Sequence, residues 1–160
     1  MINLNKKEIL SYILIILAIV LIRSYVVTPI RVNGDSMNNT LKNGDYMILK
    51  KYSRNHIKRF DIVVADANNE KLIKRVIALP GEKVEYKDGK LYINDKLIKN
   101  KYGSGKTENF RDYCGQNEYF IMGDNRENSL DSRMFGCVNK ERIRGTTDFV
   151  LFPFGKWKVE

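Results

Sequence analysis

The N-terminal part of the chain is almost uniformly apolar. Residues Ile9–Ile22 contain no charged side chain, and after Arg23-Ser24 the apolar pattern resumes and reaches Val27. Ile9–Val27 spans 19 residues, close to the ~20 that an α-helix needs to cross a bilayer. A cleaved signal peptide and a buried core helix are the alternatives, but no small-residue cleavage site follows the run and no polar face interrupts it. The pattern predicts one transmembrane helix over residues 9–27.

The flanking charges predict the orientation of this helix. Lys6 and Lys7 lie on a short tail, residues 1–8, and short basic segments tend to stay on the cytoplasmic side. Arg23 lies near the other end of the apolar run, where its side chain can reach the head groups. Residues 28–160 are then expected to form an extracytoplasmic domain, held at the cell membrane by a single span.

From Pro29 onward the hydrophobic pattern becomes short and alternating, which is typical of β-strands. Asp88-Gly89 predicts a hairpin, because this dipeptide readily supplies the positive φ of a tight turn. The polar stretch 99–117 is predicted to be a long surface loop. Strands are predicted over residues 30–32, 45–50, 61–65, 72–79, 82–86, 90–94, 96–98, 118–122 and 149–152. The expected fold is mainly β, with coiled antiparallel sheets in a barrel-like arrangement behind the N-terminal transmembrane helix.

Composition narrows the chemistry. Of the 160 residues 43% are hydrophobic, which excludes a disordered chain. One His and two Cys are too few for a His/Cys metal site, so no metal or other cofactor is expected. The net charge of +9 favours an anionic partner surface. For a domain anchored outside the cytoplasm we expect lipid head groups rather than nucleic acid, although a merely solvated basic face explains the charge equally well.

Three places carry residues that catalysis could use. Ser36 follows a Gly-Asp turn directly after a predicted strand, although an ordinary turn serine would have the same sequence. Lys74 and Arg75 lie on opposite faces of the strand 72–79, so one of the two cations is expected in apolar surroundings. Lys74 is either an edge-strand lysine that snorkels or a desolvated base with a lowered pKa. Residues 123–133 are rich in Asx, hydroxyl and possible Asp–Arg pairs, as an Asx-rich surface turn would also be.

In this order and context, the three places resemble those of the type I signal peptidases, which are membrane-anchored serine endopeptidases that remove signal peptides from secretory proteins. The resemblance covers nearly the whole chain. Lysine at position 74, where another branch of the family has histidine, resembles the bacterial enzymes. The short stretch from Lys74 to Gly123 resembles the compact enzymes that are typical of Gram-positive bacteria. The matching segments after the apolar run are Gly34-Asp35-Ser36-Met37, Gly44-Asp45-Tyr46-Met47, Lys74-Arg75-Val76-Ile77-Ala78-Leu79-Pro80-Gly81-Glu82, Gly123-Asp124-Asn125-Arg126 and Ser129-Leu130-Asp131-Ser132-Arg133.

The resemblance implies a Ser-Lys pair, with Ser36 as the nucleophile and Lys74 as the general base. Ser129 would hydrogen-bond the lysine amine, and the backbone N–H of Ser36 would donate to the developing oxyanion. Gly34 stands where some members of the family carry a hydroxyl that also donates to the oxyanion, so the second donor is left open. Four charged residues would brace the loop without reacting: Asp124, Arg126, Asp131 and Arg133.

The resemblance also implies signal peptides as substrates, cleaved after small residues at the first and third positions before the scissile bond. Two shallow apolar pockets are then needed, with the substrate added as a strand beside those of the enzyme. The expected pocket walls are Ile30, Val32, Met37 and Val76.

The chain departs from the family's usual pattern at three positions. Asn39 replaces a proline, and Phe60 and Ala78 replace glycines. None of the three would touch a reacting atom. Cys114 and Cys137 flank the block 123–133 in a compartment that permits disulfides, so either a bridge or two free thiols is possible.

Two other functions fit parts of the sequence. A self-cleaving repressor peptidase has similar Ser-Lys chemistry, but it would need a DNA-binding helix-turn-helix where this chain has its apolar run. A membrane-tethered basic β-domain that binds lipid or wall polymer would tolerate replacement of Ser36 and Lys74. His56 lies in a basic loop, and we expect it to be solvated rather than catalytic.

Overall fold

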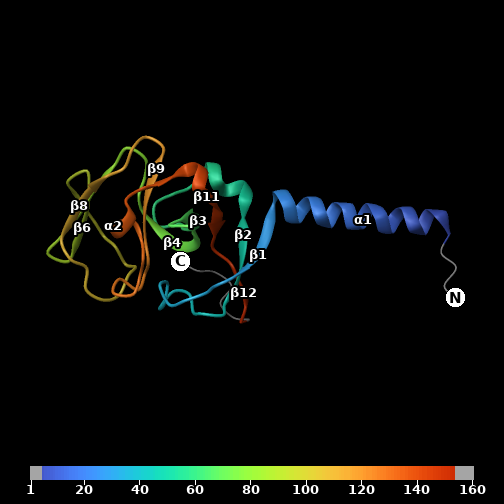
Figure 1. Ribbon diagram of the computed structural model, residues 1–160, viewed down its shortest axis with the longest axis horizontal. Coiled ribbons are helices and arrows are strands. Elements are labelled where there is room, and N and C mark those ends of the chain that lie inside the picture. The colour runs from blue at the N-terminus through green and yellow to red at the C-terminus, as the bar shows by residue number, and fades with distance from the viewer. Residues whose placement is uncertain (1–4, 154–160) are drawn as a thin grey trace.

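A long helix projects from a β-rich domain in the computed structural model, which describes residues 5–153 (Figure 1). The helix, α1 (Lys6–Tyr25), begins with a capping box in which Asn5 and Glu8 each accept the backbone N–H of the other. It starts before the apolar run, and Val27, predicted to end it, instead begins the first strand. Residues 1–4 of the predicted tail and 154–160 of the predicted domain lie outside the described residues.

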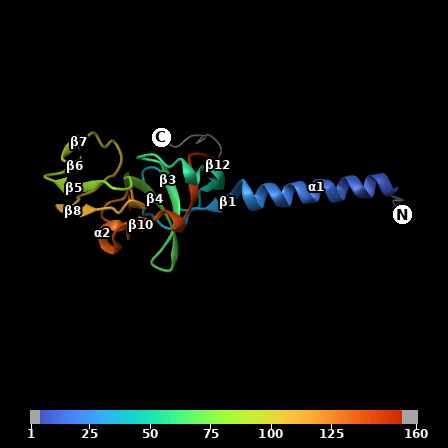
Figure 2. The same cartoon turned by 90° about the horizontal axis from the view of Figure 1, so that it is seen from above.

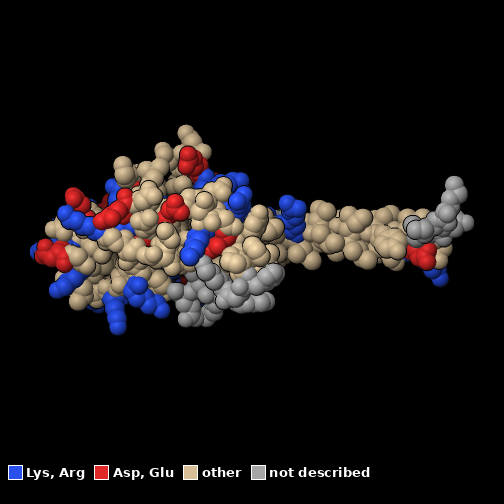
Figure 3. All heavy atoms as spheres, turned by 90° about the horizontal axis from the view of Figure 1, so that it is seen from below, with Lys and Arg blue, Asp and Glu red and all other residues tan. Residues whose placement is uncertain are grey.

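The apolar surface of α1 is exposed. Its large hydrophobic side chains between Ile9 and Ile22 are 45–61% exposed. Figure 3 shows an apolar stalk with charged side chains only at its two ends. Within residues 5–153, however, no helix meets the combined length and hydropathy of a membrane-crossing segment. The structure therefore does not support the transmembrane helix predicted over residues 9–27.

Eight strands form an antiparallel sheet in the order β1-β2-β11-β3-β4-β9-β10, with β12 beside β2. Pro29 lies in the edge strand β1, where a missing N–H is tolerated. Strand β9 pairs with β4 only from Arg75 onward, so the first half of β4 has a free edge. The strands are β1 (Val27–Arg31), β2 (Tyr46–Lys50), β3 (Ile62–Ala67), β4 (Glu70–Ala78), β9 (Glu118–Met122), β10 (Val138–Asn139), β11 (Ile143–Thr147) and β12 (Val150–Phe152).

A second sheet lies at the end of the domain farthest from α1 (Figure 2). Its order is β7-β6-β5-β8, and the β5–β6 hairpin turns at Asp88-Gly89 as predicted. Its strands are β5 (Lys83–Lys87), β6 (Lys90–Ile93), β7 (Lys96–Ile98) and β8 (Phe110–Tyr113). The prediction of a long surface loop over 99–117 was wrong at Phe110–Tyr113, because Phe110 stacks on Tyr86 and Phe120 and fixes β8 against β5.

Short helical turns and a disulfide complete the domain. The turns are η1 (Lys51–Asn55), α2 (Ser132–Phe135) and η2 (Lys140–Arg142). Cys114 and Cys137 are bonded to each other, which decides the question that the sequence left open. The bridge ties the end of β8 to the segment after α2, on either side of residues 123–133. The mainly β antiparallel fold is confirmed.

Candidate active site

Ser36 and Lys74 are in direct contact. Lys74 Nζ lies 2.6 Å from Ser36 Oγ. Ser36 lies in the turn after β1, whereas Lys74 lies in the middle of β4, so the sheet brings together two residues far apart in the chain. The Lys74 side chain is only 3% exposed, and Ser36 is half-buried at the edge of a cavity.

Burial determines the protonation of Lys74. The loss of solvation lowers its pKa from 10.5 to about 8, against the opposing effect of the carboxylates of Asp131, Asp124 and Glu70. Arg75 is buried as well, because both faces of β4 are covered. The sequence predicted that one of these two cations would lie in apolar surroundings, whereas the structure buries both Lys74 and Arg75. A lysine with this pKa is partly neutral near neutral pH and can accept a proton.

The segment 123–125 holds the turn that carries Ser36. The backbone N–H of Asn125 donates to the Ser36 carbonyl at 3.0 Å, and its side-chain amide donates to the Asp35 carbonyl at 3.1 Å. Gly123 has no room for a side chain. A Cβ at this position would lie 2.5 Å from the Ser36 carbonyl oxygen and closer still to Ser129 Oγ. Glycine is therefore required where this segment packs against the turn.

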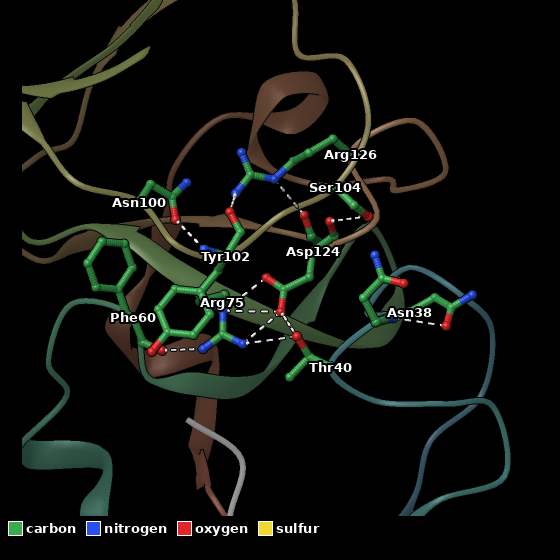
Figure 4. Close-up of polar contacts among 11 residues, drawn as sticks. Asn38, Thr40, Phe60, Arg75, Asn100, Tyr102, Ser104, Asp124 and Arg126 are labelled. Carbon is green, nitrogen blue, oxygen red and sulfur yellow. Dashed lines mark hydrogen bonds and ion pairs between the residues drawn. The ribbon is translucent and has the colours of Figure 1, made fainter. Parts of the chain in front are cut away.

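A buried ion pair joins β4, the strand that carries Lys74, to the segment 123–125 (Figure 4). Arg75 donates from Nη2 and Nε to the two carboxylate oxygens of Asp124, at 2.7 and 2.9 Å, and both side chains are 1% exposed. The Thr40 hydroxyl, from the turn after Ser36, also donates to Asp124. Asp124 thus braces β4 against the Ser36 turn, whereas Arg126 binds backbone carbonyls.

Tyr102 covers the outer face of this ion pair. The Arg75 guanidinium carbon lies 3.7 Å from the centre of the Tyr102 ring, and the Phe60 ring packs against the same tyrosine at 5.3 Å. Arg126 donates to the Tyr102 carbonyl, which fixes the loop to the same segment. Tyr102 and Thr40 were not predicted as part of the site from the sequence. An aromatic residue inside the polar stretch 99–117 was the available signal for Tyr102.

Asp131 and Arg133 form the predicted pair beside the site. Asp131 is fully buried, accepts two bonds from the Arg133 guanidinium and also accepts the Gly123 N–H. Burial acts to raise the pKa of Asp131, but the bonds from Arg133 and Gly123 and a contact with the Ser129 hydroxyl outweigh it and hold that pKa below its usual range. Ser129 Oγ is buried, and its contact with Asp131 falls short of a well-formed hydrogen bond. Its expected bond to the lysine amine stays a prediction.

A cavity of about 920 Å³ opens beside Ser36 and Lys74. It lies along β1 and the free half of β4, so it offers two strand edges to an extended chain. Of the four expected pocket walls, Ile30, Val32 and Met37 line it. Val76 does not, because its pairing with β9 places it in the core with no exposed surface. No cluster of metal-ligating side chains occurs among residues 5–153.

Comparison with known proteins agrees with this geometry. Residues 6–152 match the signal peptidase, peptidase S26, family. The chain is 34% identical over 180 residues to signal peptidase IB of Staphylococcus aureus (strain COL), covering 96% of this chain and 94% of that protein. It is 36% identical over 174 residues to signal peptidase I of Bacillus licheniformis, covering 95% and 94%. A solved structure of signal peptidase I from Enterococcus faecalis V583 superposes with a TM-score of 0.52 at 34% identity, over 56% of this chain and 95% of that one.

These similarities and the fold together define a serine endopeptidase. The chain belongs to the signal peptidase family, peptidase S26. This family membership excludes the interpretation of the chain as a non-enzymatic domain that binds lipid or wall polymer. It also favours a signal peptidase over a self-cleaving repressor.

Proposed function

We propose that this peptidase removes signal peptides from secretory proteins with Ser36 as the nucleophile and Lys74 as the general base. The observation that carries the proposal is the contact between Lys74 Nζ and Ser36 Oγ at the mouth of a cavity that is lined by β1 and the free half of β4. The lowered pKa of Lys74 supports the same roles, because the neutral amine is the form that accepts a proton.

The reaction proceeds in two proton-coupled stages. Neutral Lys74 takes the proton of the Ser36 hydroxyl as Oγ attacks the scissile carbonyl, and the resulting ammonium protonates the leaving amine. Water, deprotonated by the same lysine, then hydrolyses the acyl-enzyme and returns Ser36 to its starting state. The ammonium form donates to Oγ, and loss of its proton reverses the direction of that hydrogen bond.

Backbone groups are proposed to stabilise the oxyanion. The Ser36 N–H is the first donor. The Gly34 N–H donates to the Asn43 side chain at 3.2 Å and is not a free second donor in this arrangement. Ser129 is proposed to orient the amine of Lys74. Asp124, Arg126, Asp131 and Arg133 are proposed to hold the loop in place.

The substrate is proposed to bind as a strand between β1 and the free half of β4. Ile30, Val32 and Met37 bound the space beside Ser36 and favour small side chains before the scissile bond. We therefore expect cleavage after small residues at the first and third positions. No cofactor is needed for this chemistry, and nucleic acid is not a proposed partner.

We also propose that α1 anchors the enzyme to the cell membrane, with the tail 1–8 cytoplasmic and the catalytic domain outside. The exposed apolar side chains of α1 support a lipid partner, because water would solvate such a surface poorly. The positive charges near both helix ends suit head groups.

The full-length enzyme in detergent micelles tests the catalytic assignment. It should cleave a preprotein directly after the last residue of a small-x-small sequence, as N-terminal sequencing of the product would show. Ser36→Ala and Lys74→Ala should each abolish most cleavage, and the double variant should be hardly slower, because the two residues act as a unit. Lys90→Ala, on the distant strand β6, is the control and should be unaffected. Retained cleavage in either single variant would contradict the proposal.

A further inference from the structure

A second cavity, of about 730 Å³, lies apart from Ser36 and Lys74. It is formed by the η1 turn, the loop before β3, the end of β11 and the loop that carries Tyr102. None of the residues assigned to the nucleophile, the base or the substrate walls lines it. The signal peptidase chemistry leaves this cavity without a role.

The cavity lies beside the base of α1. The backbone N–H of Lys51 donates to the Val26 carbonyl at 2.9 Å, and its ammonium donates to the Arg23 carbonyl at 3.2 Å. The neighbouring residues Tyr52, Ser53 and His56 line the cavity. Figure 3 shows basic side chains gathered where the apolar stalk meets the domain. If α1 lies in lipid, this cavity faces the head groups.

The charges of the cavity favour an anion. Three of its cations are paired with carboxylates: Lys50 with Asp148, Arg59 with Glu82 and Arg75 with Asp124. Lys58 and Lys101 are exposed and form no salt bridge within the part of the chain that the structure describes. Two carboxylates line the cavity: Asp148, which is paired with Lys50, and Asp61, which accepts the Lys58 backbone N–H. Burial raises the pKa of Asp61, against the opposing effect of the Lys58 backbone N–H and the Lys58 charge.

A buried hydroxyl provides a second, independent sign of a ligand. Thr147 is 2% exposed and lines the cavity, and its Oγ1 has no hydrogen-bond partner among residues 5–153. Buried hydroxyls are normally satisfied, so an unpaired one at a cavity wall suggests a missing acceptor. A phosphate oxygen accepts hydrogen bonds from a hydroxyl and from lysine ammonium groups alike.

We propose that this cavity binds a phosphate group, held by Lys58, Lys101 and the Thr147 hydroxyl. Its position at the base of α1 makes the phosphodiester of an anionic lipid head group the natural source, and this source rests on the membrane anchoring proposed above. Free phosphate has the same chemistry and is distinguished below. The site would hold the catalytic domain at a fixed height and rotation on the membrane surface.

His56 provides a direct probe. It is the one histidine of the chain and lines the cavity, so its imidazole NMR signals report binding without further assignment. The full-length protein in neutral detergent micelles is titrated with inorganic phosphate at fixed pH and ionic strength, with chloride as the reference anion. We expect a saturable shift with phosphate and none with chloride.

Matched variants locate the ligand. Lys58→Gln/Lys101→Gln and Thr147→Val should each weaken the phosphate affinity, the first by about tenfold or more. Lys87→Gln/Lys90→Gln removes the same charge from the tip of the β5–β6 hairpin, in the second sheet, and should leave it unchanged. The absence of a saturable shift, or equal affinities in the two double variants, would overturn the site.

Lipid and free phosphate are then compared. In bicelles with phosphatidylglycerol the His56 signals should already lie at the saturated position without added phosphate, and in neutral phosphatidylcholine bicelles they should lie away from it. Signals away from the saturated position in both bicelles, with binding of inorganic phosphate retained, would assign the site to free phosphate and reject the lipid source. Saturated signals in both bicelles would reject the requirement for an anionic head group. Because the readout is binding, it is independent of whether Ser36 and Lys74 perform the proposed cleavage.

Discussion

The buried ammonium group of Lys74 lowers the stability of the folded state. Its pKa of about 8 in the fold lies below the ordinary value of 10.5, so between these two values the unfolded chain binds more protons than the folded one. Stability from this group therefore rises as the pH increases from about 8 to 10.5. Below pH 8 the full penalty applies, on the order of 3 kcal/mol from the difference in pKa.

Lys74→Met should consequently yield an inactive but more stable protein. At pH 7 we expect its free energy of unfolding to exceed that of the parent by about 1–3 kcal/mol, because an apolar side chain replaces a desolvated charge. The gain should shrink between pH 8 and 10.5, as denaturant unfolding at several pH values would show. The exposed neighbour Lys71→Met is the control and should change little. A Lys74→Met protein that is no more stable at pH 7 would contradict the buried ammonium.

Gly123 is expected to be intolerant of even one methyl group. Gly123→Ala should lower kcat by about tenfold or more with a smaller effect on KM, because the added Cβ displaces the Ser36 turn relative to Lys74. Steady-state cleavage of a peptide substrate measures both constants. Gly115→Ala meets only the flexible Glu118 side chain and serves as the control. Equal kcat values for the two variants would show that this contact does not position the nucleophile.

Two departures from the family pattern have a backbone explanation that the sequence alone does not provide. Asn39 adopts φ of 84°, which asparagine tolerates and proline cannot reach. Phe60 adopts φ of 71°, an unusual value for a bulky residue, at a position where glycine is usual. Its ring packs on Tyr102, so its side chain has a use that glycine would not supply. The contact between Ser36 and Lys74 could be expected from the motifs and their order, but these backbone angles could not.

At the level of elements, the loop between β7 and β8, residues 99–109, packs across the back of the site, and we call this loop the strap. It places Tyr102 on the Arg75 guanidinium, and its Ser104 backbone pairs with Asp124 and Arg126. The strap thus contacts the strand that carries Lys74 and the segment that holds the Ser36 turn. Its sequence is polar, so hydrophobic periodicity could not assign it this role.

Tyr102→Leu should weaken this strap. We expect kcat to fall several-fold, and stability to fall by about 1–2 kcal/mol as a desolvated cation–π contact is lost. Tyr102→Phe keeps the ring and should restore both values. Tyr113→Leu, at an exposed position on β8, is the control. An unchanged kcat in Tyr102→Leu, with only the stability reduced, would make the contact purely structural.

Strand β11 shows why part of the sheet escaped prediction. Its buried positions are Ile143, Gly145 and Thr147, so only one of the three is strongly hydrophobic. Gly145 packs against the Lys50 carbonyl, where a side chain would collide. In contrast, β3 and β4 carry β-branched runs at their buried positions and were predicted close to their observed bounds.

The described molecule consists of the projecting helix α1 and the β-rich peptidase domain. The second sheet lies farthest from α1, while β1 leads directly from the helix to the Ser36 turn (Figures 1 and 2). If α1 lies in lipid, Ser36, the proposed nucleophile, is about one short strand from the membrane end of the domain, which suits a substrate whose own apolar segment is membrane-bound. The apolar run predicted a helix that is not buried in the domain, but the helix begins at Lys6 and ends at Tyr25 instead of covering residues 9–27.

The proposed anchoring predicts a defined topology. Protease added to intact protoplasts should digest the catalytic domain and leave the N-terminal tail protected, because the basic tail is proposed to remain cytoplasmic. Immunoblotting with tags at the two ends reads out both parts. A domain that is protected until the membrane is disrupted would reverse the orientation, and release of the protein by alkaline carbonate would contradict anchoring by α1.

The pH dependence of kcat/KM tests the central claim most directly. The full-length enzyme is assayed on a peptide without titrating groups, together with the Lys74→Arg and Lys74→His variants. The rate should rise with pH through an apparent pKa of about 8 and then level off, because only neutral Lys74 accepts the Ser36 proton. Lys74→Arg should be inactive at every pH, since guanidinium stays charged, and any activity of Lys74→His should move to lower pH with the imidazole. A parent profile that does not titrate near pH 8, or one that Lys74→Arg reproduces, would contradict lysine as the base.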